Sequence, residues 1–183
     1  MSHLKQIFKK EIIPALQKDL KIANPQAVPS LEKIILNVGV GKIVSRESKS
    51  LERIVEGMTL IGGQKPIITK ARKAISGFKL REGSPVGVKI TLRSKRMYDF
   101  IERLVKVILP RMRNFQGLSE KSIDQNYNLT IGLKDVAAFP ELSHQKKIEY
   151  NFGLEITFVT KAKTHNETLL LFEKLGLIFK KDN

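Results

Sequence analysis

The stretch that decides the fold is EKIILNVGV, residues 32–40. Large apolar residues fill every second position of this stretch, namely Ile34, Leu36, Val38 and Val40. The positions between them hold Lys33, Ile35, Asn37 and Gly39. A period of two is typical of a β-strand, because successive side chains of a strand point to opposite faces of its sheet. The stretch therefore predicts a strand with one face on the core and one face toward solvent.

The same alternation recurs at residues 86–93, 128–134 and 154–160, and residues 65–71 form a shorter extended segment. Apolar residues at helical spacing predict helices over residues 3–23, 51–61, 94–109 and 164–175. Strands with one polar face indicate an open, largely antiparallel sheet, with helices packed on one face and the opposite face left for a partner. Since no long linker interrupts the pattern, we expect one α+β domain over residues 1–183.

Two prolines fall inside the predicted helices. Pro14 lies within the 3–23 segment and should kink the helix or split it, and Pro110 should end the helix that starts near Ser94. Between the short extended segment at 65–71 and the strand at 86–93, residues 72–85 contain Gly77, Gly83 and Pro85, which predict a loop.

The charge of the chain points to a polyanionic partner. There are 33 Lys+Arg against 18 Asp+Glu, a net charge of +15. Nucleic acid and an anionic membrane surface are the two candidates. No apolar run approaches the roughly 20 residues of a spanning helix, no secretory signal is present, and the chain has no cysteine. These features predict a soluble cytoplasmic protein.

The most basic segment, residues 64–96, separates the two candidates. It holds ten basic residues and one acid, Glu82. Its pattern of strand, glycine-containing loop and strand differs from the amphipathic helix that lies on a membrane, which favours RNA and no membrane partner. Outward Asn37, Lys89, Thr91 and Arg93 can hydrogen-bond phosphates, 2′-hydroxyls and base edges. Because Phe78 is the only aromatic residue in the segment, we expect recognition of RNA shape rather than extensive base stacking.

The sequence gives no sign of catalysis. Residues 39–42, GVGK, lack the first glycine of a phosphate-binding loop and are followed by Ile43 instead of Ser or Thr. Histidines 3, 144 and 165 are scattered, and the acids Asp124, Asp135 and Glu141 form no recognisable carboxylate pair. We therefore expect a protein that is not an enzyme, with no catalytic residue, no metal site and no cofactor.

Several blocks, in order along the whole chain, resemble bacterial large-subunit ribosomal protein five. The most specific is GQKPIITKARK, residues 63–73, which follows VP at 28–29 and LNVGVG at 36–41. Further matches are GFKLR at 77–81, TLR at 91–93, FIERL at 100–104, GLS at 117–119, FPE at 139–141 and GLEIT at 153–157. The sequence departs from the family at Gln116, where Arg is frequent, and at residues 124–129, where an Asp-Gly-Arg-Gly-Asn-Tyr stretch is common.

The resemblance implies a structural protein that binds 5S rRNA and helps to attach it in the central protuberance of the large ribosomal subunit. It also implies contacts with 23S rRNA, P-site tRNA, other large-subunit proteins of the central protuberance and a small-subunit head protein at an intersubunit bridge. The residues implied for 5S rRNA are Lys33, Asn37, Gln64, Lys65, Thr69, Lys70, Thr91, Arg93 and Arg96. Those implied to approach tRNA are Arg72, Lys73, Lys79 and Arg81.

Two other hypotheses remain at this point. A free-standing RNA chaperone or translational regulator would use the same polar sheet face. A nucleotide-dependent enzyme is disfavoured by the incomplete phosphate-binding loop.

Overall fold

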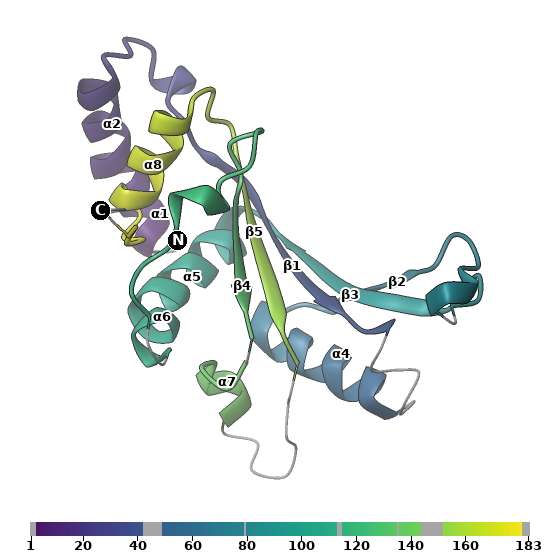
Figure 1. Cartoon of the computed structure of the whole chain (residues 1–183). Helices are drawn as coiled ribbons and strands as arrows, with labels where there is room; N and C mark the ends of the chain where they lie inside the picture. Colours follow the sequence, from purple (N-terminus) through teal and green to yellow (C-terminus); the bar gives the residue numbers. More distant parts are fainter. Residues whose placement is uncertain are drawn as a thin grey trace. The chain divides into compact units, whose positions relative to one another are not determined.

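The computed structural model describes residues 3–41, 49–78, 80–112, 115–134, 136–143 and 152–180. Its strands form one open sheet in the order β2-β3-β1-β5-β4 (Figure 1). The strands are β1 (Leu31–Gly39), β2 (Ile67–Lys70), β3 (Pro85–Leu92), β4 (Leu129–Leu133) and β5 (Leu154–Thr160). The predicted α+β fold with an open antiparallel sheet is confirmed, and each long strand lies within about two residues of its predicted bounds.

The helices alternate with these strands along the chain. The α-helices are α1 (His3–Ile7), α2 (Ile13–Leu20), α4 (Lys49–Gly62), α5 (Ser94–Arg103), α6 (Leu109–Arg111), α7 (Pro140–Ser143) and α8 (His165–Lys174). Two π-helical turns, η1 (Phe8–Ile12) and η4 (Leu104–Ile108), join α1 to α2 and α5 to α6. Short 3₁₀ turns are η2 (Pro25–Ala27), η3 (Ser76–Phe78) and η5 (Glu120–Ser122).

The chain forms two compact units. The first, here called the terminal unit, comprises residues 1–34, 92–131 and 157–183. The second, the ribbon unit, comprises residues 35–91 and 132–156 and contains the paired strands β2 and β3. Each unit has its own buried apolar residues and its own polar strand residues.

In the terminal unit, helices cover the apolar side of the strands. Phe158 of β5 packs edge-on against Phe172 of α8, with ring centroids 5.6 Å apart. Phe8 of η1 lies 5.5 Å from Tyr98 of α5. As predicted, Thr164 caps α8, because its hydroxyl accepts a hydrogen bond from the Glu167 backbone N–H.

In the ribbon unit, α4 lies directly against β3. A Cβ placed on Gly62 would come within 2.6 Å of Ile90 Cδ1. The absence of a side chain at Gly62 therefore permits this close approach. Buried residues of α4 complete the apolar layer, among them Ile54, Met58 and Ile61.

The two helical prolines are accommodated in the same way. Pro14 and Pro110 each follow a π turn, in which the Ile13 N–H bonds the Phe8 carbonyl and the Leu109 N–H bonds the Leu104 carbonyl. A proline has no N–H and clashes with the carbonyl four residues back, and a wider turn relieves both defects. Pro14 thus neither ends nor separates the helical segment, which stops at Leu20 rather than at residue 23. The prediction that Pro110 ends its helix was wrong by one residue, since α6 includes Arg111.

The predicted loop at residues 72–85 continues the β2–β3 ribbon as a hairpin (Figure 1), here called the arm (residues 71–84 without residue 79, which lies outside the described residues). The backbone N–H of Ala71 donates to the Ser84 carbonyl at 2.8 Å, and Ile75 and Leu80 exchange backbone hydrogen bonds of 2.9 and 3.1 Å. The turn at Ser76–Phe78 closes the arm. Gly83 adopts a φ of +80°, which favours glycine and explains the residue type there.

Candidate RNA interface

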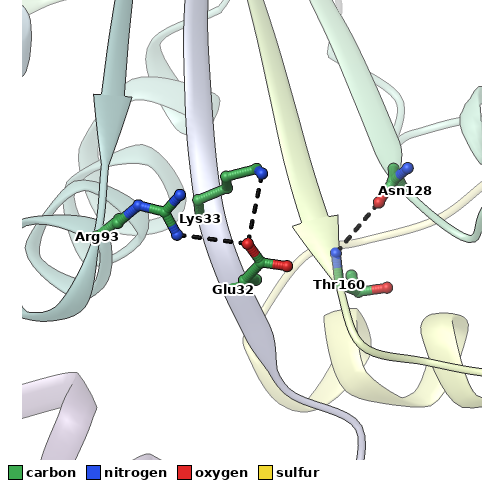
Figure 2. Close-up of polar contacts among 5 residues, drawn as sticks. All are labelled: Glu32, Lys33, Arg93, Asn128 and Thr160. Carbon is green, nitrogen blue, oxygen red and sulfur yellow. Dashed lines mark hydrogen bonds and ion pairs between the residues drawn. The ribbon is translucent and has the colours of Figure 1, made fainter.

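One cluster of the terminal unit joins two predicted RNA-binding cations to an acid. Nζ of Lys33 and Nη1 of Arg93 both lie 3.4 Å from the same carboxylate oxygen of Glu32 (Figure 2). Hydrogen bonds from Lys33 and then from Arg93 lower the pKa of Glu32, so the carboxylate is charged at neutral pH. We call these three residues the acid-paired cluster. Their side chains stay accessible, at 28% for Lys33, 39% for Glu32 and 56% for Arg93.

Neutral hydrogen-bonding groups lie on other strands of the same unit. The hydroxyls of Thr130 and Thr157, on β4 and β5, are 3.2 Å apart and half-buried. The amide oxygen of Asn128 accepts from the Thr160 backbone N–H at 3.3 Å (Figure 2). These hydrogen bonds link β5 to β4 and to the residue that precedes β4. The hydroxyl and amide groups can also donate hydrogen bonds to the hydroxyls of ribose or accept hydrogen bonds from them.

The segment that departs from the family pattern has a clear local structure. The Asp124 carboxylate accepts hydrogen bonds of 2.8 Å from the backbone N–H groups of Asn126 and Asn128. Burial alone would raise the pKa of Asp124, but the hydrogen bonds from Asn128 and Asn126 outweigh it and lower the pKa. Tyr127 has a φ of +62°, a conformation that favours glycine. The tyrosine thus stands at a position where its backbone is strained.

In the ribbon unit, hydrogen bonds orient the side chains of the predicted residues Asn37 and Gln64, and the bond from Gln64 ends on the backbone of the predicted residue Thr91. Nδ2 of Asn37 donates to a carboxylate oxygen of Glu155 at 3.2 Å. Nε2 of Gln64 donates to the Thr91 backbone carbonyl at 3.2 Å, which fixes the segment after α4 to β3. All three side chains are half-buried.

The pairing of β2 with β3 places further predicted residues on one face. Ile67 pairs with Lys89, and Thr69 pairs with Gly87, in antiparallel register. Directly opposed residues share a face, so Ile67, Thr69, Lys89 and Thr91 form one surface around Gly87, here called the ribbon face. A Cβ on Gly87 would lie 2.7 Å from Thr69 Oγ1 and 3.7 Å from Asn37 Oδ1. Gly87 of β3 therefore allows the polar side chains of Thr69 on β2 and Asn37 on β1 to lie close to its backbone.

Three lysines on or beside the ribbon face have no acidic partner among the residues that the structure describes. Lys65 and Lys70 are exposed and Lys89 is half-buried, and none of them forms an ion pair with any residue that the structure describes. Arg96 is exposed on α5 of the terminal unit and has interactions of its own. A phosphate could approach the three lysines without first displacing a carboxylate of the described residues.

The residues predicted to approach tRNA lie on the arm. Arg72, Lys73 and Arg81 are exposed on it, and Lys79 lies outside the described residues. Arg72 and Lys73 lie on the side of the arm that follows β2, and Arg81 lies on the side that leads to β3. The arm therefore has exposed basic side chains on both sides of the hairpin.

Sequence reasoning missed three features of this interface. Glu32 neutralises Arg93 although the two residues are 61 positions apart, and Glu155 binds Asn37 across 118 positions. Ile67 is the third: its side chain is 72% exposed on a face otherwise lined by polar groups. The position of Ile67 on this face follows from its pairing with Lys89. That pairing is known only once the register of β2 against β3 is known.

Two family models together match most of the chain. Residues 24–81 match the model described as Ribosomal protein L5, and residues 85–179 match the model of the C-terminus of the same ribosomal family. Within the described ranges, no cluster of His, Cys, Asp or Glu could hold a metal ion. The helices among those residues also include none that is long and apolar enough to cross a membrane.

Proposed function

This chain belongs to the ribosomal protein L5 family, and on that premise we propose that its polar strand residues hold 5S rRNA and its arm approaches P-site tRNA. Membership makes it a structural, non-catalytic component of the cytoplasmic large ribosomal subunit that binds rRNA. The finer assignments to 5S rRNA and to tRNA are our proposal.

The observation that carries the 5S rRNA proposal is the ribbon face, which holds Lys89, together with the exposed Lys65 and Lys70 that flank it in the sequence. Hydroxyl groups of Thr69 and Thr91 stand beside Lys89 on this face, at fixed strand spacing. Hydroxyls and ammonium groups on a rigid surface suit the ribose and phosphate oxygens of folded RNA, which is recognised mainly by shape. The exposed Ile67 supplies an apolar contact for a ribose or an unstacked base.

The acid-paired cluster supports the same proposal through its geometry. The Glu32 carboxylate holds the Arg93 guanidinium and the Lys33 ammonium within 3.4 Å of one oxygen atom. Preorganised donors lose less conformational freedom when they bind phosphate. We therefore assign to Arg93 and Lys33, with Asn37 and Gln64, selective contacts with 5S rRNA.

The arm is assigned to a second RNA. It continues the ribbon as a hydrogen-bonded hairpin, and it carries Arg72, Lys73 and Arg81 at its exposed surface. A narrow basic hairpin that extends from the ribbon face can contact the phosphate backbone of an RNA other than the one bound on that face. Contacts with 23S rRNA, central-protuberance proteins and a small-subunit head protein complete the proposal, in line with attachment of 5S rRNA in the central protuberance.

The proposal is tested by washing large subunits that contain this protein in increasing salt and following cosedimentation. An integral 5S rRNA-binding component largely remains with the subunit, whereas a loosely bound regulator would be washed off. The arm is tested separately with Arg72→Ala and Lys73→Ala. We expect unchanged 5S rRNA affinity and altered tRNA protection, while a loss of 5S rRNA affinity would reassign the arm to 5S rRNA.

A further inference from the structure

A cavity in the terminal unit has a lining that the rRNA-binding residues named above do not explain. It lies beside the N-terminal helical segment and encloses about 360 Å³, which falls within the range of about 300–1,000 Å³ of small-ligand pockets. Its walls come from η1 and its flanking helices, the segment around η2, and α5. The lining residues are Lys5, Phe8, Lys9, Ile13, Pro25, Gln26, Val28, Ser30 and Tyr98.

The charged groups of the cavity are all positive. Lys5 and Lys9 lie four positions apart, and no acid is among the lining residues. Lys5 is half-buried and Lys9 exposed, and neither forms an ion pair with a described residue. Two cations without an acid at the edge of a cavity attract an anionic group.

The deeper part of the cavity is aromatic and apolar. Phe8 and Tyr98 have ring centroids 5.5 Å apart at an angle of 44°, and they are only 4% and 7% exposed. Ile13 and Val28 lie beside them. A flat ring placed here gains aromatic contact and covers apolar surface.

Uncommitted polar groups accompany the rings. No described residue hydrogen-bonds the Tyr98 hydroxyl, which remains accessible to solvent although the residue as a whole is only 7% exposed. Burial raises the pKa of Tyr98, so the phenol is neutral and can donate. Gln26 and Ser30 add an amide and a hydroxyl to the same wall, which can hydrogen-bond the edge of a ring.

We propose that this cavity is a binding site for a single unstacked nucleotide, with the base beside Phe8 and Tyr98 and the phosphate beside Lys5 and Lys9. The nucleotide can belong to an RNA strand or be free in solution, and the rRNA binding of the family favours a strand. This site is separate in residues from the ribbon face and the acid-paired cluster, so it can fail while the 5S rRNA proposal stands.

The test follows the NMR signals of the full chain during three titrations, with a single-stranded oligoribonucleotide, a nucleoside monophosphate and inorganic phosphate. The chain has three tyrosines, so the Tyr98 ring can be observed individually. We expect the oligoribonucleotide to shift the Tyr98 ring and the Gln26 amide. Phosphate alone should leave the ring unchanged.

Two variants and one control locate the contacts. Lys5→Ala with Lys9→Ala should flatten the salt dependence of oligoribonucleotide binding by about 1.4 in log–log slope. Lys10→Ala with Lys18→Ala changes the charge of the same helical segment equally, at exposed residues outside the cavity, and should leave the Tyr98 shift intact. Tyr98→Phe keeps the ring and should weaken binding about two- to tenfold, as expected for one lost hydrogen bond.

Shifts from the mononucleotide but not from the oligoribonucleotide would keep the nucleotide site and overturn its assignment to an RNA strand. Equal shifts from phosphate and nucleotide, or equal losses in the two double-lysine variants, would overturn the nucleotide site itself. The same titrations on a chain with Arg93→Ala, together with a measurement of its 5S rRNA affinity, separate the two proposals. That substitution should reduce 5S rRNA binding and leave the cavity signals unchanged.

Discussion

The acid-paired cluster and the ribbon face carry cations of the same kind in opposite electrostatic settings. In the first, Glu32 lies 3.4 Å from both Lys33 and Arg93. On the ribbon face and beside it, Lys89, Lys65 and Lys70 form no ion pair with the described part of the chain. Exposed ion pairs contribute little to stability, so the Glu32 pairing serves mainly to orient its partners. From this difference we expect the lysines without acidic partners to contribute most of the RNA affinity. We expect the acid-paired cluster to contribute most of the selectivity for 5S rRNA.

The largest effect should come from removing the ribbon lysines. Lys65→Ala, Lys70→Ala and Lys89→Ala together should lower 5S rRNA affinity roughly a hundredfold near physiological salt and reduce the salt slope by about three. Nitrocellulose-filter binding over a salt series measures both quantities. A variant that lost affinity without a change in slope would show that these lysines do not contact phosphates.

A smaller but more selective loss of 5S rRNA affinity is expected from two polar contacts, Arg93 in the acid-paired cluster and Asn37 beside the ribbon face. Arg93→Ala with Asn37→Ala should weaken 5S rRNA binding about tenfold and leave the fold intact, because neither side chain is buried. Competition with an unrelated RNA at matched salt should show that most of the loss falls on the 5S complex. Unchanged 5S affinity at matched salt would remove both residues from the interface.

Neutralising Glu32 should raise RNA affinity, whereas the two preceding sets of substitutions lower it. Glu32→Gln removes a charge that repels phosphate and competes for Arg93 and Lys33, so RNA affinity should rise about two- to fivefold at low salt. Because its partners lower the pKa of Glu32, the folded-state carboxylate remains charged above its ordinary pKa and protonates only below it. The gain should therefore be constant from about pH 6 to about pH 8, as isothermal titration can check. A loss of affinity would show that orientation by Glu32 outweighs its charge.

The smallest predicted effect concerns the two isoleucines of β2. Ile67 is 72% exposed and lies opposite Lys89, whereas Ile68 is 40% exposed and lies opposite the buried Val88. Ile67→Ala should weaken RNA binding about threefold with no change in salt slope, since an apolar contact releases no counterions. Ile68→Ala is the matched control on the other face of the same strand. Equal effects of the two changes would indicate a general defect of the strand.

Sequence patterns predicted the fold well where burial follows a simple period. The alternation of β1 identified Ile34, Leu36 and Val38, which are fully buried. It could not reveal that Gly87 is buried, because Thr69 and Asn37 close over it from neighbouring strands. The π turns before Pro14 and Pro110 likewise arise from hydrogen bonding that composition does not encode.

The sequence predicted only those residues of the candidate RNA interface whose positions follow from local alternation. Outward strand positions such as Thr91 and Arg93 follow from local alternation. Their partners do not, because Glu32 and Glu155 reach Arg93 and Asn37 only once the strands have paired. The backbone pairing within the arm also escaped prediction, since the glycine-containing pattern of residues 72–85 gives no sign of the hydrogen bonds between Ile75 and Leu80.

The central claim, that the ribbon face lies on 5S rRNA, can be tested by directed cleavage. The chain has no cysteine, so Ile67→Cys offers a single attachment point for an iron chelate on the ribbon face. Glu56→Cys places the same probe on an exposed position of α4 in the same unit. The account predicts hydroxyl-radical cleavage of 5S rRNA in one compact region from position 67 and little or none from position 56. Stronger 5S cleavage from position 56, or cleavage from position 67 confined to 23S rRNA, would contradict it.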